Sequence, residues 1–228
     1  MGAIAQRILY EDNHLIAVNK YPGEIVQGDK SGDEPLSSLT ARYLKETYGK
    51  PGNVFLGIPH RLDRPSSGAV LFARTEKALS RMSVMFKQRE VIKIYWAVLD
   101  CMPPEAEGEL RHFLVKNSEK NKSVASAREK RGAKEGRLTY RVIGATDNYF
   151  LVEINLLTGR HHQIRAQFAA LGCRIKGDLK YGAPRSNRDG GIHLHARSLD
   201  FTHPVRKERI VITADPPREQ LWNIFRDL

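Results

Sequence analysis

The chain has 228 residues, with 37 Lys and Arg against 26 Asp and Glu, which gives a net charge of +11. This length favours one domain, and a hydrophobic share of 41% is enough for a globular core. Such a positive excess favours binding to phosphate backbones, although an ordinary basic protein would also show it. No apolar run approaches the roughly 20 residues of a membrane helix, and the N-terminus lacks the pattern of a signal peptide.

The chain contains two cysteines, Cys101 and Cys173, which have no metal-type spacing. Isolated cysteines of this kind are more often small buried hydrophobic residues than disulfide partners. Disulfides are also rare in reducing compartments. We therefore expect two free thiols and a cytoplasmic location.

Strand and helix patterns alternate along the first half of the chain. The predicted elements are a hairpin over 7–19, a helix over 36–48, a strand over 68–74, a helix over 76–89 and a strand over 91–99. The strand at 68–74 has an unbroken apolar centre, which indicates burial on both faces. Thr75 is a suitable N-cap for the helix that follows it.

The second half continues in the same way after an interruption. The predicted elements are a hairpin over 138–157, a helix over 161–171 and a strand over 192–201. Between 103 and 137 the apolar pattern fades, which predicts a basic insertion that is either a mobile arm or a solvated loop. We expect a single domain over 1–228 with an α+β fold and a mixed, largely antiparallel β-sheet.

The segment His60-Arg61-Leu62-Asp63-Arg64-Pro65-Ser66-Ser67-Gly68 leads directly into the buried strand at 68–74. Asp63 stands between two arginines and close to a histidine. Opposite charges and hydrogen-bond donors favour the ionised form of a carboxyl group. Asp63 therefore suits a nucleophile that must stay charged beside a polyanion.

A second cluster, Thr158-Gly159-Arg160-His161-His162-Gln163-Ile164-Arg165, joins the end of a predicted strand to the start of a helix. Free backbone N–H groups and the helix dipole at such a junction attract anions. The guanidinium groups of Arg160 and Arg165 suit phosphate or carboxylate. The alternative is that Arg165 is an ordinary residue on the helix surface.

Other kinds of site find little support. His193 and His195 share a strand face, but no Asp, Glu or Cys cluster accompanies them, and the neighbours His161 and His162 would point apart on a helix. We therefore expect no metal. The chain has no Walker-type phosphate loop, dinucleotide fingerprint or Gly-x-Ser-x-Gly motif.

Taken together, these segments closely resemble the signatures of RluA-type pseudouridine synthases over about residues 7–215. The shared motifs are His60-Arg61-Leu62-Asp63 with Ser67-Gly68, Thr158-Gly159-Arg160, His162-Gln163-Ile164-Arg165, Gly177-Asp178 with Tyr181-Gly182, and Leu194-His195-Ala196 with His203-Pro204. The resemblance implies a pseudouridine synthase fold with flanking helices, a central active-site cleft and no cofactor. It also implies isomerisation of specific uridines in structured RNA, in which the C1′–N1 bond breaks, the base turns and C1′ joins C5.

The resemblance also implies roles for individual residues. Asp63 matches the family's nucleophile, which attacks either C1′ of the ribose or C6 of the ring. Arg165 matches the arginine that pairs with this aspartate. Tyr95 matches the tyrosine that packs on the target base and is a candidate acceptor for the C5 proton.

Further residues are implied in RNA binding. A uridine inside folded RNA must be extruded, and Arg61 matches the residue that enters the gap. His60 and Arg64 would flank the RNA backbone. Weaker candidates for RNA contact are Arg160, His162 and Lys176.

The chain departs from the family pattern at several positions. His161 stands where Thr is usual, Gln167 stands where His is frequent, and Lys20-Tyr21-Pro22-Gly23 carries one extra residue before its proline. Because strand-like sequence begins by Arg7, we expect no N-terminal S4-type domain. RNA specificity would then come from the catalytic domain, including its basic insertion.

Two other functions are open to the same sequence. One is a non-catalytic RNA-binding or folding protein, although such a protein has no reason to keep Asp63, Tyr95 and Arg165 together. The other is a glycoside or nucleoside hydrolase, which needs a second carboxylate that the Asp63 region lacks. We expect a monomeric RNA pseudouridine synthase that acts on ribosomal or transfer RNA.

Overall fold

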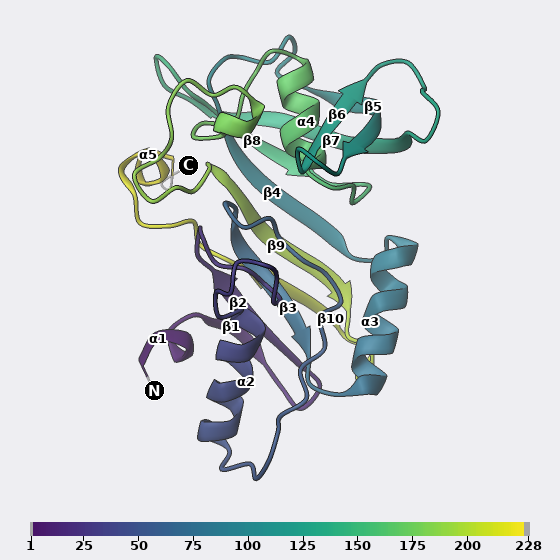
Figure 1. The fold of residues 1–228 in the computed structure, drawn as a ribbon, viewed down its shortest axis with the longest axis vertical. Coiled ribbons are helices and arrows are strands. Elements are labelled where there is room, and N and C mark those ends of the chain that lie inside the picture. Colours follow the sequence, from purple (N-terminus) through teal and green to yellow (C-terminus); the bar gives the residue numbers. More distant parts are fainter. Residues whose placement is uncertain (1, 226–228) are drawn as a thin grey trace. The chain divides into compact units, whose positions relative to one another are not determined.

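The computed structural model describes residues 2–225, which form two compact units (Figure 1). The first unit comprises residues 2–92 and 196–216, and the second comprises residues 93–195 and 217–225. The strand pairs whose registers are described are antiparallel, which agrees with the predicted α+β class. Within the described residues, no helix is long and apolar enough to cross a membrane.

The first unit is a sheet in the order β1-β2-β3-β9, with β10 paired to β9. Its elements are α1 (Gly2–Ala5), β1 (Ile8–Glu11), β2 (Leu15–Lys20), α2 (Leu36–Thr47), β3 (Ser67–Ala73), α3 (Glu76–Gln88), most of β9 (Leu194–Thr202) and β10 (Arg209–Thr213). The predicted hairpin, helices and strand of this region are all present, with ends shifted by a few residues.

Helices α2 and α3 cover opposite faces of the strands β2 and β3 (Figure 1). Side chains alternate along a strand, so Val70 and Phe72 pack with Leu36 and Leu44 of α2. On the other face, Ala69, Leu71 and Ala73 pack with Ala78 and Met82 of α3. The prediction that this strand is buried on both faces is therefore confirmed.

Both ends of α3 follow from local chemistry. The Thr75 hydroxyl accepts a hydrogen bond from the Ala78 backbone N–H at 3.2 Å, as predicted for an N-cap. Arg89 ends the helix in the left-handed region at φ 66°. These caps fix where the chain leaves α3 and enters the next strand.

The second unit is a sheet in the order β4-β8-β7-β5-β6 with helix α4 packed on one face. Its elements are β4 (Ile92–Leu99), β5 (Glu107–Asn117), β6 (Lys122–Ser126), β7 (Lys134–Ala145), β8 (Phe150–Asn155), α4 (Gln163–Ala170), the 3-10 turn η1 (Leu179–Tyr181) and α5 (Gln220–Ile224). The first residue of β4, Ile92, belongs to the first unit.

The predicted irregular insertion at 103–137 is instead largely strand. Strands β5 and β6 form a hairpin, and β5 also pairs with β7. Only one face of these strands is packed, with Leu110, Leu114 and Leu138 buried. Because the other face carries charged side chains, the period-two apolar pattern is too sparse to be recognised from sequence.

The expectation of two free cysteines is wrong. Cys101 and Cys173 form a disulfide that spans 72 residues, with their Cα atoms 5.2 Å apart. It connects the segment after β4 to the segment after α4. No spacing rule could show this pairing, because it depends on where α4 returns to the sheet. The argument from cysteine usage for a reducing compartment therefore loses its support.

We expect the stability of the folded chain to fall as the pH is lowered below about 6.5. Burial lowers the pKa values of His112, His193 and His203 below the ordinary value of 6.5. Within this window the unfolded chain binds more protons than the folded chain, so acid favours unfolding. Denaturant titrations at several pH values measure the effect, and a flat profile would contradict it.

The variant His203→Asn removes one titrating group from this comparison, together with the contact between His203 Nε2 and the Asp12 carboxylate at 3.0 Å. His203 Nδ1 accepts hydrogen bonds from the backbone N–H groups of Val205 and Arg206. An Asn carbonyl oxygen can accept the same bonds but does not titrate. The pH dependence of stability should therefore be shallower in this variant.

Candidate active site

Asp63 lies in the first unit, in the turn that leads into β3. The Ser66 backbone N–H donates to the Asp63 carbonyl oxygen at 3.1 Å and closes the turn. The Asp63 side chain is half-buried. The carboxylate is therefore held on a short, structured connection directly before a rigid buried strand.

The buried side chain of Lys20 stabilises this turn through hydrogen bonds. It is wholly buried at the end of β2, and its ammonium donates to the carbonyl oxygens of Tyr21 and Arg64 at 3.0 Å and of Ser66 at 2.5 Å. The Gly23 backbone N–H also donates to the Arg64 carbonyl oxygen at 2.9 Å. The segment with the extra residue before its proline thus supports the residues that follow Asp63.

Burial lowers the pKa of Lys20 to about 7, and the carboxylates of Glu24 and Asp63 oppose that shift. An ammonium group has three donors and no acceptor, so three carbonyl oxygens suit it well. We did not identify Lys20 as a site residue from sequence. A lysine at the end of the apolar run Leu15–Lys20 was the available signal.

The side chain of His60 packs within the first unit. Its Nε2 accepts the Leu71 backbone N–H of β3 at 2.9 Å, and its ring stacks on Phe86 at 4.5 Å. Arg61 and Arg64 are exposed, and Arg64 forms an ion pair with Asp33. The structure thus places two basic side chains beside Asp63 at the surface, and the RNA contacts of all three residues stay predictions.

Gly68 explains why a glycine follows the serines of this motif. Its φ is +118°, and a Cβ atom there would lie 2.3 Å from the carbonyl oxygen of Ala196 in β9. Strands β3 and β9 therefore approach too closely for any side chain at this position.

Tyr95 lies in the second unit, on the sheet face that carries α4. Its register partner is Ile154, which also pairs with Tyr140. Direct partners in antiparallel strands point to the same face. Tyr140 packs edge-on against Phe168 of α4 at 5.5 Å, so Tyr95 shares that face and is 9% exposed.

Arg165 is buried in α4, at 4% exposure, and is not a helix-surface residue. Its Nε and Nη2 donate to the two carboxylate oxygens of Asp178 at 2.7 and 2.8 Å. The Tyr181 ring centroid lies 5.0 Å from its guanidinium carbon. Asp178 is thus a site residue that sequence reasoning left without a role. The pairing with Asp63 joins residues of the two units and stays a prediction.

The loop before α4 is shaped by Gln163, the first residue of the helix. Its Oε1 accepts from the Thr158 hydroxyl at 2.7 Å and from the Arg160 backbone N–H at 3.0 Å, and its Nε2 donates to the Arg137 carbonyl oxygen. Arg160 also donates from Nε to the Glu135 carbonyl oxygen. Thr158 and Gln163 therefore hold the loop before α4 in one conformation, which explains their place in the motif.

Lys176 belongs to a chain of hydrogen bonds in the second unit. Its ammonium donates to Asn187 at 2.7 Å, Asn187 contacts His193 at 2.9 Å, and His193 contacts Glu219 at 2.9 Å. Glu219 is also the N-cap of α5. The C-terminal helix is thereby tied to the loop that carries Lys176, whose RNA contact stays a prediction.

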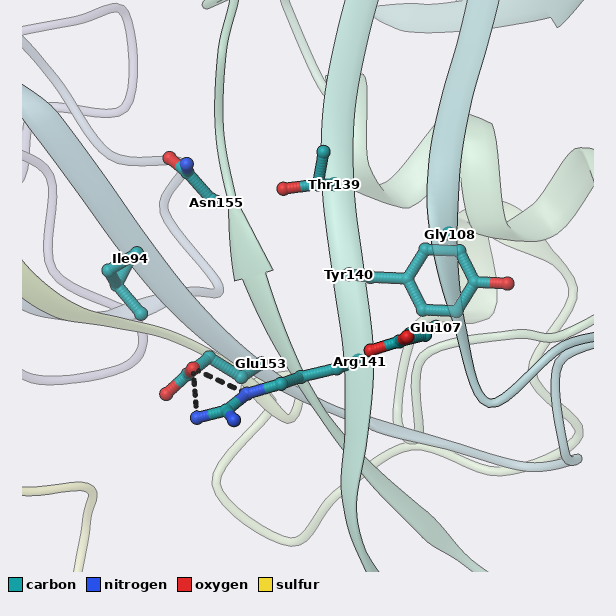
Figure 2. A pocket seen from close by; sticks show the side chains of 8 residues that line it. All are labelled: Ile94, Glu107, Gly108, Thr139, Tyr140, Arg141, Glu153 and Asn155. Carbon is teal, nitrogen blue, oxygen red and sulfur yellow. Dashed lines mark hydrogen bonds and ion pairs between the residues drawn. The ribbon is translucent and has the colours of Figure 1, made fainter.

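An open pocket of about 490 Å³ lies in the second unit (Figure 2). The side chains of Ile94, Thr139 and Arg141 belong to the sheet face opposite Tyr95, since neighbouring strand residues alternate. Arg141 pairs there with Glu153 at 2.9 Å. None of the predicted catalytic residues Asp63, Tyr95 and Arg165 is among the residues that line this pocket. Among residues 2–225, no three His, Cys, Asp or Glu side chains are placed to hold a metal ion.

Comparisons with known proteins show which family this chain is similar to. A family model described as RNA pseudouridylate synthase matches residues 14–170. The tRNA pseudouridine synthase C of Haemophilus ducreyi is 32% identical, over 96% of this chain and 95% of that protein. The ribosomal large subunit pseudouridine synthase D of Zymomonas mobilis is 28% identical, over 95% of this chain and 71% of that protein.

Among solved structures, human RNA pseudouridylate synthase domain containing 4 is similar, with a TM-score of 0.80 at 25% identity. The match covers 98% of this chain and 93% of that chain. The chain spans 65% of the length of one curated relative and 99% of another. The fold, the ordered motifs and the match over residues 14–170 lead to one conclusion: the chain belongs to the family of RNA pseudouridine synthases.

Proposed function

We propose that this chain converts specific uridines of transfer or ribosomal RNA to pseudouridine, with Asp63 as the nucleophile and without a cofactor. The observation that carries the proposal is the Asp63 turn, which a wholly buried lysine holds through the carbonyl oxygens of Arg64 and Ser66. Relatives named for transfer RNA and for ribosomal RNA support these substrate classes. Given these substrates, we further propose that it acts as a monomer in the cytoplasm.

In the proposed reaction the Asp63 carboxylate attacks C1′ of the ribose or C6 of the base. Attack at C1′ breaks the C1′–N1 bond, and the uracil anion turns until C5 faces C1′. Bond formation between C5 and C1′ releases the carboxylate, after which C5 loses its proton and N1 gains one. Tyr95 is the proposed acceptor of the C5 proton, and Arg165 is proposed to favour the ionised form of Asp63.

RNA recognition is proposed to use basic residues of both units. Extrusion of the uridine leaves a gap in the RNA stack, and the exposed side chain of Arg61 is the proposed filler. His60, Arg64, Arg160, His162 and Lys176 remain proposed RNA contacts.

The test uses unmodified transfer RNA and large-subunit ribosomal RNA transcripts that carry tritium at uridine C5. Each pseudouridine formed releases one tritium, so release to solvent measures the reaction. Release from one class of transcript, with the position then mapped, would support the proposal. RNA binding without any tritium release would instead favour the non-catalytic RNA-binding alternative.

We expect the variant Lys130→Gln/Arg131→Gln to bind RNA more weakly and with a smaller dependence on salt. The segment 116–137 carries eight basic residues against three acidic ones, and these two are exposed. Each lost phosphate contact reduces the slope of log affinity against log salt by about 0.7 to 0.9. Filter binding across a salt series measures the slope.

A matched control for this variant is Lys45→Gln/Lys50→Gln, which removes the same charge from exposed positions at the end of α2. The control should change the slope less. Equal slopes in the two variants would show that the basic segment contributes only to net charge.

A further inference from the structure

Strand β6 is the last strand in the order of the second unit, so no strand among residues 2–225 pairs with its outer edge. At Ser123 the side chain of Tyr181 forms the backbone contacts that a neighbouring strand would otherwise make. The Tyr181 hydroxyl accepts the Ser123 backbone N–H at 2.9 Å and lies 3.0 Å from the Ser123 carbonyl oxygen. This contact pairs an otherwise unpaired strand edge and attaches β6 to η1.

The same tyrosine also contacts the helix that carries Arg165. Its hydroxyl lies 3.1 Å from Nδ1 of His162, the N-cap residue of α4. Its ring lies 5.0 Å from the Arg165 guanidinium carbon and 4.8 Å from the Lys122 ammonium. Tyr181 is only 6% exposed. One buried side chain therefore joins the hairpin β5–β6, the start of α4 and Arg165.

A second set of contacts holds the turn of the same hairpin. His161 Nδ1 lies 2.9 Å from the Ser123 hydroxyl, and its Nε2 lies 3.1 Å from the Asn121 side-chain oxygen. The Lys180 ammonium donates to the Asn121 carbonyl oxygen at 3.2 Å. His161 is one of the positions at which this chain departs from its family pattern. The hairpin is therefore attached to the motif loop through His161, a position at which this chain departs from the usual Thr.

The attached hairpin carries basic side chains. Lys116 and Lys120 are exposed on it, and Lys180 is exposed beside its turn. Such side chains suit phosphate groups. RNA bound along the hairpin can reach Arg165 only while the hairpin and α4 keep a fixed relation, so a loosened hairpin should weaken productive binding of the RNA.

We propose that Tyr181 is a positioning residue that fixes the hairpin β5–β6 relative to Arg165, so that RNA held by the hairpin is aligned for the reaction. This inference rests on the proposed function, because it assigns Arg165 a part in the reaction. It adds to that function a defined coupling between RNA binding and the buried arginine.

The experiment compares Tyr181→Phe, which removes only the hydroxyl, with Asp178→Asn, which weakens the support of Arg165. Loss of the hydroxyl should raise KM for the tritiated transcripts about fivefold to tenfold, with kcat changed less than about twofold. Asp178→Asn should instead lower kcat. Tyr140→Phe is the control, since it removes a hydroxyl bonded to the Glu105 carbonyl oxygen in the same unit.

Hydrogen exchange provides a readout that does not depend on activity. In Tyr181→Phe, amides of the hairpin around Ser123 should exchange at least about tenfold faster, while those of β8 stay unchanged. Unchanged KM together with unchanged exchange would overturn the proposal, and so would a loss confined to kcat. If the wild type releases no tritium, the proposed function fails, and hairpin exchange with RNA affinity still decides the role of Tyr181.

Discussion

Asp63→Asn is expected to lower the rate of pseudouridine formation by at least about 10⁴-fold, because an amide of the same shape cannot act as the nucleophile. RNA affinity should stay within about twofold, since the side chain keeps its size and the basic surface is intact. Single-turnover tritium release measures the rate, and filter binding of the same transcript measures affinity.

Asp29→Asn is the matched control for this experiment. It makes the same chemical change at an exposed carboxyl group of the same unit, where Asp29 bonds only to Ser31 among the contacts described. The control should keep wild-type activity. A variant Asp63→Asn that retained more than about a tenth of the wild-type rate would remove Asp63 from the role of nucleophile.

Lys20→Met is expected to lower the free energy of unfolding by about 2–4 kcal/mol and to slow the reaction. Three carbonyl oxygens lose their buried donor, and each unsatisfied group costs about 1–3 kcal/mol, while removal of the buried charge offsets part of this loss. The reaction slows because the turn that carries Asp63 loses its support. Urea titration and tritium release measure the two effects, with the exposed Lys50→Met as the control.

The pH dependence of this variant separates a role of the lysine charge from simple packing. The pKa of Lys20 is lowered from 10.5 to about 7 in the folded chain. Between these values the unfolded chain binds more protons, so wild-type stability should rise with pH across that window. Lys20→Met should lack this rise. Parallel stability curves for the two proteins would show that Lys20 does not titrate there.

Much of the fold could be predicted because its signals are local. The unbroken apolar run before Arg74 indicated a strand buried on both faces, and Thr75 indicated the start of α3. Strands β5 and β6 escaped prediction because their outward face is charged and only Leu110 and Leu114 repeat on the packed face of β5. The disulfide escaped because its cysteines lie 72 residues apart.

The candidate site divides in a similar way. The order of the motifs was enough to single out Asp63 and Arg165, because these two residues stand in long, specific segments. Tyr95 was singled out from the short segment Lys93-Ile94-Tyr95. Their neighbours could not be found in this manner. Asp178 accepts a hydrogen bond from Arg165 across a loop, and Lys20 donates one to the carbonyl oxygen of Arg64, which lies more than forty residues away.

By itself, the sequence determined which family this chain belongs to, where most helices and strands begin, and which carboxylate to test as the nucleophile. Only the tertiary structure decided that Lys20 holds the Asp63 turn, that Asp178 pairs with Arg165 and that Tyr181 attaches the hairpin to α4. The physical reason is that caps and apolar periods act over a few residues. Side-chain partners, in contrast, depend on strand order and on how distant segments pack together.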